Sequence, residues 1–235
     1  MQLVIADALF ADYPDLVLGV VSAHGLANTP DQPEITALLR QAEAELPGKF
    51  GGTPVIEHPH IVPWREAYRR FGAKPRDYPS SIENLARRVL NGAQFPHINN
   101  LVAIYNTISL RHLLPVGGED LDQISGDVRL IYAGDAEPAV VLLGEKDANA
   151  PRPGEIIYTD DVGAICRRWN WKEADRTKLT PETRHAFLVS EALPPVARAT
   201  VETAIHELAE LVQRYCGGSV STAFLDTHQR AVTLR

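Results

Sequence analysis

The spacing of apolar residues predicts strands and helices in alternation over the first part of the chain. The N-terminal run 1–15 and the β-branched run 16–26, which ends at Asn28-Thr-Pro, each predict a strand. In 33–48 the apolar residues recur on one helical face, and Pro47-Gly48 is expected to end that helix. The glycine- and proline-rich segment 48–61 predicts a loop.

Three further helices are predicted between residues 62 and 114. Trp64, Tyr68 and Phe71 fall at helical spacing in 62–72. Ser80 and Glu83 form a capping box, which predicts the start of a helix that ends at Asn91-Gly92.

The segment 99–114 has its apolar residues near one helical face, so it predicts a helix with Asn99 or Asn100 as the N-cap. Pro115 to Gly118 then breaks the pattern. A helix with an amide-rich start and a glycine-rich exit is open to two interpretations, namely ordinary packing or the wall of a binding pocket.

The pattern then changes to short β-rich runs separated by turn residues. These runs predict an antiparallel sheet made of 127–133, 139–144, 155–160 and 162–169. Thr180-Pro181-Glu182 is typical of a helix start, and this helix is expected to reach about Leu193.

After Pro194-Pro195, the amphipathic segment 196–218 predicts a helix with a glycine stop, and 220–226 and 231–235 predict strands. This mixed order indicates an α+β fold with mixed or antiparallel sheets and packed helices, rather than a regular βαβ array. We expect one domain over 1–235.

Composition narrows the class of protein. The 235 residues, 45% of them hydrophobic, are enough for a sizeable core. No run approaches the roughly 20 apolar residues of a membrane span, and the acidic N-terminal run does not resemble a signal peptide. With only two cysteines, Cys166 and Cys216, a disulfide framework is not expected and a reducing cytoplasm is the default.

The net charge of −7 argues against a protein that binds nucleic acid over its whole surface. Two segments are nevertheless basic, because 65–88 has seven bases against three acids and 167–178 has five against two. They form a basic patch if they meet in space, and otherwise they are two solvated faces.

Several kinds of active site are missing from the sequence. Zinc motifs, phosphate-binding glycine loops and the nucleophile elbow are absent, and no cofactor or metal is expected. Cys166 beside two arginines is either an activated thiol or a buried strand cysteine, and the second is favoured. His58 and His60 could bind a metal together with a distant ligand, but histidines without such a role are commoner in a loop. His24 could act in acid–base chemistry, but a surface histidine at a strand end is the favoured interpretation.

What remains is a set of polar residues near glycines. A site built from them would position substrate and water rather than activate a nucleophile. The residues are Asn99, Asn100, Asn106, Asp120, Asp160, Asn170, Thr177 and Thr180.

The segment 98–126, INNLVAIYNTISLRHLLPVGGEDLDQISG, resembles the tRNA-binding editing domain of the phenylalanyl-tRNA synthetase β subunit, called B3/B4. Freestanding proteins of that family also carry the W…Y…FG of 64–72, the S-x-E-x-L-x-R-R of 81–88 and the R-W-N-W of 168–171. The resemblance covers roughly residues 16–193. The positions of 98–126 that match are Asn99, Asn100, Asn106, Pro115, Asp120, Leu121, Asp122, Ile124 and Gly126.

The resemblance implies a fold like that editing domain and an aminoacyl-tRNA deacylase that acts in trans on the aminoacylated 3′ end of tRNA, with no DNA or membrane partner. Such a hydrolase removes wrongly attached amino acids, which a synthetic pocket rejects only weakly. Ester cleavage needs a placed water and oxyanion donors, and the terminal ribose hydroxyl can assist.

This chain departs from the family at two positions. The family's first Asp falls on Ala103, and its editing-site His falls on Gly117, with His112 close but out of register. The segment 167–180 does not align residue by residue, so amino acid specificity is not carried over. Gly117 either enlarges the pocket for another amino acid or marks a loss of activity.

Three hypotheses follow. In the first, a tRNA editing hydrolase, 95–126 and 155–180 face one pocket, with main-chain N–H groups of Gly117 and Gly118 as oxyanion donors and Asp120 beside them. The substrate would be bound by Asn99, Asn100, Asn106, Asp160, Asn170, Trp171 and Thr177. In the second, the chain binds tRNA or an amino acid without catalysis. The third, an unrelated hydrolase, rests on Cys166 and His24.

Overall fold

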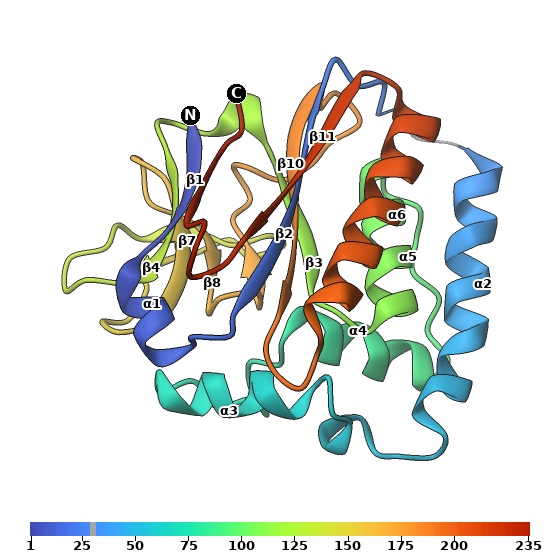
Figure 1. Cartoon of the computed structure of the whole chain (residues 1–235), viewed down its shortest axis with the longest axis horizontal. Coiled ribbons are helices and arrows are strands. Elements are labelled where there is room, and N and C mark those ends of the chain that lie inside the picture. Colours follow the sequence, from blue (N-terminus) through green and yellow to red (C-terminus); the bar gives the residue numbers. More distant parts are fainter. Residues whose placement is uncertain (29–31) are drawn as a thin grey trace.

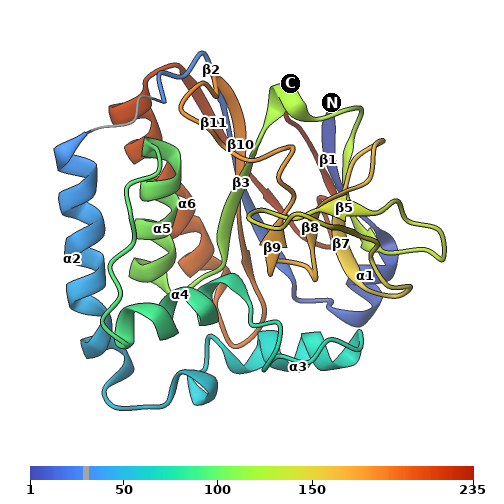
Figure 2. The same cartoon turned by 180° about the vertical axis from the view of Figure 1, so that it is seen from behind.

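In the computed structural model, which describes residues 1–28 and 32–235, two β-sheets and a layer of helices lie side by side (Figures 1 and 2). The fold is α+β with mixed and antiparallel sheets, as the sequence predicts. Thr29 and Pro30, which were expected to follow the second strand, fall outside the described residues.

The larger sheet has the strand order β12-β1-β4-β7-β8-β9. Strand β1 pairs with β4 in parallel, and the other pairs are antiparallel. Its strands are β1 (Gln2–Ile5), β4 (Val128–Tyr132), β7 (Ile156–Thr159), β8 (Ala164–Arg167), β9 (Lys172–Glu173) and β12 (Ala231–Thr233).

The smaller sheet is antiparallel throughout, in the order β11-β2-β10-β3. Its strands are β2 (Val17–His24), β3 (Val116–Asp120), β10 (His185–Ala192) and β11 (Ser219–Leu225). Strands β5 (Val140–Val141) and β6 (Ala148–Asn149) form a separate two-stranded ribbon.

Helices α5 and α6 pack on the face of the smaller sheet that points away from the larger one, α2 packs on the outside of α5, and α3 and α4 close one end of the molecule (Figure 1). The helices are α1 (Asp7–Asp12), α2 (Pro33–Phe50), α3 (Val62–Arg70), α4 (Ser81–Leu90), α5 (Asn100–His112) and α6 (Arg198–Cys216), with short 3₁₀ turns at Val55–Glu57 and Leu121–Gln123. None of the helices in the described part of the chain is both long and apolar enough to cross a membrane.

Helix α6 shows how sequence pattern becomes packing. Val201, Ile205 and Leu208 recur at helical spacing, and all three are fully buried. A Cβ at Gly19 of β2 would come within 2.2 Å of Ile205, so this glycine lets α6 approach the sheet closely. One hydrophobic cluster extends from Leu3 to Leu234 and includes residues of both sheets and of the helices.

The predicted helix caps are confirmed. The Ser80 hydroxyl accepts a hydrogen bond from the Glu83 N–H at 3.4 Å at the start of α4. The Asn99 side chain accepts one from the Val102 N–H at 3.0 Å, so Asn99 rather than Asn100 is the N-cap of α5. Both helices end within two residues of the predicted positions.

The predicted helix over 180–193 is wrong, because the segment forms a turn followed by strand β10. The Thr180 hydroxyl does accept a hydrogen bond from the Glu182 N–H at 3.3 Å, but this local cap closes only a turn. The strand that follows pairs with β2 on one side and β3 on the other, and this tertiary pairing overrides the local helix signal.

Smaller predictions also need correction. Helix α2 continues through Pro47 to Phe50 and ends at Gly51, which has a left-handed conformation. Residues 116–118 belong to strand β3 rather than to a turn, and most of 139–144 lies outside the larger sheet. The N-terminal run forms the predicted strand and then helix α1, which the pattern did not indicate.

Candidate functional site

A cavity of about 290 Å³ lies between helices α4 and α5, strand β3 and the hairpin of β8 and β9. It brings together the two segments that the sequence predicts to face one pocket. Its wall is part apolar and part polar, since Tyr105 and Trp171 line it together with Asn106, Asn170 and Glu119. Convergent polar groups in an apolar cavity are typical of ligand-binding sites.

The hairpin of β8 and β9 supplies one wall through its four-residue tip, 168–171. Arg168 and Trp169 both have positive φ, which turns the chain back over two residues. The Trp169 side chain is fully buried between Tyr13 and Trp64, with ring centroids 4.9 Å and 5.2 Å away. This aromatic packing holds the tip in its strained conformation.

Asn170 ties the hairpin tip to three other elements. Its side-chain amide donates to Glu191 of β10 at 2.6 Å, and its side-chain oxygen accepts from the Tyr68 hydroxyl at 2.9 Å. Its carbonyl accepts from the Ser81 N–H at 2.9 Å. The three outlying motifs at 64–72, 81–88 and 168–171 therefore meet at one place and support the same wall of the cavity.

Glu191 is buried and well satisfied. Trp169 Nε1 donates to it at 3.0 Å, and the Tyr158 hydroxyl and the Asn170 amide donate as well. Burial raises its pKa to about 7, although these hydrogen bonds act in the opposite direction. Its carboxyl faces the cavity wall from β10 and fixes the hairpin tip.

The arginines of the hairpin are structural. Arg167 makes a bidentate pair with Glu155, with Nε–Oε1 at 2.8 Å and Nη2–Oε2 at 2.7 Å, and both side chains are buried. Burial would raise the pKa of Glu155, but the hydrogen bonds and charge of Arg167 lower it below the usual value. The Arg168 guanidinium packs on the rings of Tyr78 and Trp171, at 3.7 Å and 4.4 Å from their centroids, and the two rings contact each other edge to face.

Two carboxyl groups face the cavity where the glycine pair lies. The Gly118 N–H points away from β10 and toward Glu173 Oε1 at 3.5 Å. A Cβ at Gly117 would come within 2.9 Å of the same oxygen, so the glycine makes room for this carboxyl. Glu119, the next residue, is buried and its Oε2 has no hydrogen-bond partner among the described residues.

Both carboxyl groups are weaker acids than usual. Burial raises the pKa of Glu173 to about 7. Burial and then the neighbouring Glu173 carboxyl raise the pKa of Glu119 well above its usual value. Tyr105, on α5, also has its pKa raised by burial and by these two acids, so it remains a neutral phenol.

The structure brings five of the predicted site residues to the cavity: Asn106, Gly117, Gly118, Asn170 and Trp171. Gly117 and Gly118 reach it from strand β3, and Asn106 reaches it from α5. The Asn170 side chain already hydrogen-bonds to Glu191 and Tyr68. Of the predicted side chains, Asn106 and Trp171 are therefore the ones available to contact a ligand.

The other five predicted residues do not line the cavity. Asn99 is fully buried as the cap of α5, and its amide donates to the Leu179 carbonyl at 3.1 Å. Asn100 contacts the His97 ring at 3.0 Å. Asp120 accepts hydrogen bonds from the Asp122 N–H and the Thr183 hydroxyl.

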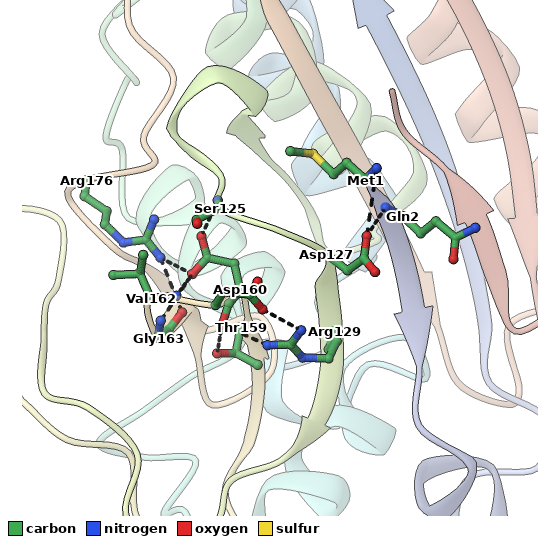
Figure 3. Close-up of polar contacts among 11 residues, drawn as sticks. Met1, Gln2, Ser125, Asp127, Arg129, Thr159, Asp160, Val162, Gly163 and Arg176 are labelled. Carbon is green, nitrogen blue, oxygen red and sulfur yellow. Dashed lines mark hydrogen bonds and ion pairs between the residues drawn. The ribbon is translucent and has the colours of Figure 1, made fainter.

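Asp160 also has a structural place, in a loop that follows β7 (Figure 3). Its carboxylate accepts from the N–H groups of Ser125 and Val162, both at 2.9 Å, and pairs with Arg176 at 2.5 Å. Arg129 binds the carbonyl of the same residue, and Asp127 nearby binds the N-terminal residues (Figure 3). The network joins loops of the larger sheet.

Thr177 stands behind the cavity wall. Its hydroxyl is buried with no partner among the described residues. Its interaction with Glu119 lowers the pKa of that carboxyl, against the larger opposing effect of burial. The Thr177 carbonyl accepts from the Asp120 N–H at 2.9 Å, which continues the edge of β3.

The residues behind the unrelated-hydrolase hypothesis do not form a catalytic pair. Cys166 lines the cavity, but burial and the nearby acids Glu173, Glu119 and Glu191 raise the pKa of its thiol well above the usual value. Its thiol is thus protonated rather than activated. His24 instead contacts His185, with the two Nδ1 atoms 3.2 Å apart, across strands β2 and β10.

No metal site emerges at the histidine pair 58–60. The His58 Nδ1 accepts from the His60 N–H at 3.2 Å, and its ring packs on Phe50. Over residues 1–28 and 32–235, no group of three or more His, Cys, Asp or Glu side chains is arranged to hold a metal ion.

The two basic segments do meet, but only in 65–88 are most of the exposed bases of the described structure without an ion pair. In the described structure the bases of 167–178 pair with acids, for example Lys172 with Glu145 at 2.7 Å. In 65–88, Arg70 and Arg88 are exposed but lie over the rings of Tyr13 and Phe95. The other exposed bases around α3 and α4 form what we call the basic strip: Arg69, Lys74, Arg76 and Arg87. Two surface hollows that share Arg65 and Arg76 run along it.

Sequence reasoning missed Glu119, Glu173 and Tyr105. Glu119 follows the glycine pair directly, so its nearness to that pair was readable. Glu173 is 55 residues from Gly118, and only the pairing of β8 with β9 carries it there. Tyr105 precedes Asn106, and its place depends on how α5 is rotated against β3.

Comparison with known proteins adds a family match. The family model of the B3/4 domain matches residues 63–217. Among solved structures, an N-terminal fragment of the phenylalanyl-tRNA synthetase β-subunit from Pyrococcus horikoshii is similar, with 12% identity and a TM-score of 0.48. The alignment covers 93% of this chain and 49% of that fragment, so the chain spans about half its length. No curated protein matches the sequence.

Proposed function

Because this chain belongs to the B3/4 domain family, we propose that it is an aminoacyl-tRNA editing domain that hydrolyses mischarged aminoacyl-tRNA in trans. One observation carries the proposal: the cavity receives residues from both 98–126 and 156–173 and is lined by Asn106, Gly118 and Trp171. The terminal adenosine and its aminoacyl ester would enter this cavity.

The basic strip supports tRNA as the partner. Its four side chains are exposed, and among the described residues only Arg87 comes within ion-pair distance of an acid, 3.7 Å from Glu83. Arg88 follows Arg87 on α4 and lines the cavity, so the strip and the cavity are neighbours on this helix. Phosphates that lie along the strip would place the 3′ end near the cavity.

For hydrolysis, the Gly118 N–H is the available oxyanion donor, since it points out of the sheet and into the cavity wall. Gly117 gives a carbonyl close access, and Asp120 holds the end of β3 through its two hydrogen bonds. The Glu173 carboxyl would have to leave the Gly118 N–H, or stay protonated, when the oxyanion forms.

A panel of mischarged tRNAs incubated with the protein tests this function. Release of the amino acid above the buffer rate for at least one pair is the expected result. A uniform buffer rate across the panel would refute the hydrolase.

A second candidate is a module that binds tRNA or an amino acid derivative without catalysis. The position of the Glu173 carboxyl favours it, because a carboxylate beside the Gly118 N–H repels an oxyanion. Salt-sensitive tRNA binding with no loss of the ester distinguishes this module from the hydrolase.

A further inference from the structure

The cavity contains more acid than base. Glu119 is 4% exposed and its Oε2 has no hydrogen-bond partner in the described structure. Glu173 is half-buried beside it and receives only the long contact from the Gly118 N–H. Neither acid forms an ion pair with any residue of 1–28 or 32–235, and buried carboxyls without a partner are costly.

The nearby cations are already engaged. Lys172 lines the cavity but bonds to Glu145 at 2.7 Å, and Arg176 binds Asp160. Arg88 stacks over the Phe95 ring, with its guanidinium 4.3 Å from the ring centroid. Among the described residues, no cation therefore forms an ion pair with either acid, although the charge of Arg176 lowers the pKa of Glu119.

The rest of the wall suits a cation on an apolar stem. Tyr105 and Trp171 present aromatic rings to the cavity, and Ile165 and Val102 present aliphatic surface. Aromatic faces attract ammonium and guanidinium groups. Glu191 adds to the negative surroundings, but its own oxygens are taken by three donors.

We propose that this cavity binds its ligand through an ammonium or guanidinium group placed between Glu119 and Glu173. The identity of the carrier rests on the proposed function: in an aminoacyl-tRNA, the group is either the α-ammonium or a basic side chain of the aminoacyl moiety. Glu173, in its ionised form, repels the carboxylate of a free amino acid. The cavity therefore selects the esterified or amidated amino acid over the free one.

Protonation of Glu173 follows from this arrangement. Its pKa is about 7, so a cation that binds at pH 6 displaces a proton, and one that binds at pH 8 does not. Affinity for a ligand whose cation stays charged to pH 8, such as a lysine side-chain ammonium, should rise with pH over this range. An α-ammonium, with a pKa of about 8, loses its own charge there. The other titratable groups that face Glu173 are Glu119, Tyr105 and Cys166, all with raised pKa values.

Calorimetric titration with four amides tests the proposal without tRNA. L-Lysinamide carries both cations, L-norleucinamide only the α-ammonium, N-acetyl-L-lysinamide only the side-chain ammonium, and N-acetyl-L-norleucinamide neither. At pH 7, where the α-ammonium and the side-chain ammonium are both mostly charged, at least one singly charged amide should bind about tenfold more tightly than the uncharged one, as a charged hydrogen bond contributes. The tighter of the two identifies the source of the cation.

Two isosteric variants locate the interaction. Glu119→Gln and Glu173→Gln should each weaken the charged amide by about tenfold and leave the uncharged amide unchanged. Glu182→Gln, which alters an exposed acid on the turn before β10, is the matched control and should have no effect. Thermal melting of each variant verifies that it is folded.

The proposal is overturned if the uncharged amide binds as tightly as the charged ones, if none of the four binds, or if both variants bind like the unaltered protein. A negative deacylation panel together with charge-dependent amide binding would refute the hydrolase alone. The reverse pattern would refute the cation site alone.

Discussion

At the scale of single residues, Gly117 and Gly118 are adjacent in the chain but have different neighbours. A Cβ at Gly118 would lie 2.2 Å from Leu188 Cδ2 and 2.8 Å from the Phe187 carbonyl oxygen, which belong to the paired strand β10. A Cβ at Gly117 would meet only the end of the flexible Glu173 side chain, at 2.9 Å.

Alanine substitutions separate the two glycines. Gly118→Ala should lower the free energy of unfolding by about 1–3 kcal/mol, because backbone atoms of β10 cannot move away cheaply. Gly117→Ala should cost less than roughly 1 kcal/mol, because the Glu173 carboxyl can swing aside. Urea denaturation of both variants measures the difference, and an equal or reversed order would contradict the packing described for β3.

Glu191 makes stability depend on pH. Its pKa in the folded state is about 7, against 4.5 ordinarily, so folding favours the protonated form. Its contribution to the free energy of unfolding is fully present below about pH 4.5. This contribution, roughly 3 kcal/mol, is lost as pH rises through about 7. Glu173 acts in the same direction, whereas Glu155 and Asp160, with lowered pKa values, lose their contribution only in more acidic solution.

We therefore expect the free energy of unfolding to fall between pH 5 and pH 7.5, and Glu191→Gln to flatten this slope. Urea denaturation at several pH values gives the slope directly. Glu182→Gln serves as the comparison, since it alters an exposed acid. An unchanged slope in Glu191→Gln would show that Glu191 is ionised in the folded protein at pH 5.

At the scale of elements, the hairpin of β8 and β9 depends on the buried pair of Arg167 and Glu155. Glu155→Gln would leave the Arg167 guanidinium buried without its charge partner, and should destabilise the protein by about 3–5 kcal/mol. Glu145→Gln removes a half-buried partner of Lys172 in the same region and should cost at most about 1 kcal/mol. Thermal or urea unfolding ranks the two, and similar losses would argue against a structural role for the buried pair.

Elements with strong local signals were predictable from sequence, and those set by distant pairing were not. The cap residues Ser80 and Asn99 start the predicted helices, because their hydrogen bonds close within three residues. Thr180-Pro181 carries an equally clear local signal, yet the chain after it is a strand between β2 and β3. The sequence of 180–193 does not indicate that this segment pairs with β2 and β3.

The same distinction applies to the candidate site. Gly117, Gly118, Asn170 and Trp171 were named from motifs and do line the cavity. Asn99 and Asp120 were named on equal grounds, but their side chains bind backbone groups and hold the chain in place. Motif matches identify residues that matter to the fold as well as residues that touch a ligand, and only the packed structure separates the two.

At the scale of the whole molecule, acidic and basic side chains gather in different places. The net charge is −7, and acids line the cavity, while the basic strip lies on the exposed side of α3 and α4. A polyanion is therefore attracted to one part of the surface and repelled from most of the rest. This arrangement favours a tRNA that approaches along the strip and inserts only its 3′ end.

The strip should control the salt dependence of tRNA binding. The double variant Arg69→Glu, Arg76→Glu removes two exposed cations, so the slope of log K against log salt should become shallower by about two contacts. Arg214→Glu changes an exposed arginine on α6, away from the strip, and is the matched control. Filter binding of uncharged tRNA from low to moderate salt measures both slopes. Because Arg214→Glu changes the net charge by half as much as the double variant, attraction by net charge alone predicts half the loss of affinity. If Arg214→Glu causes half the loss or more, the strip has no specific place in tRNA binding.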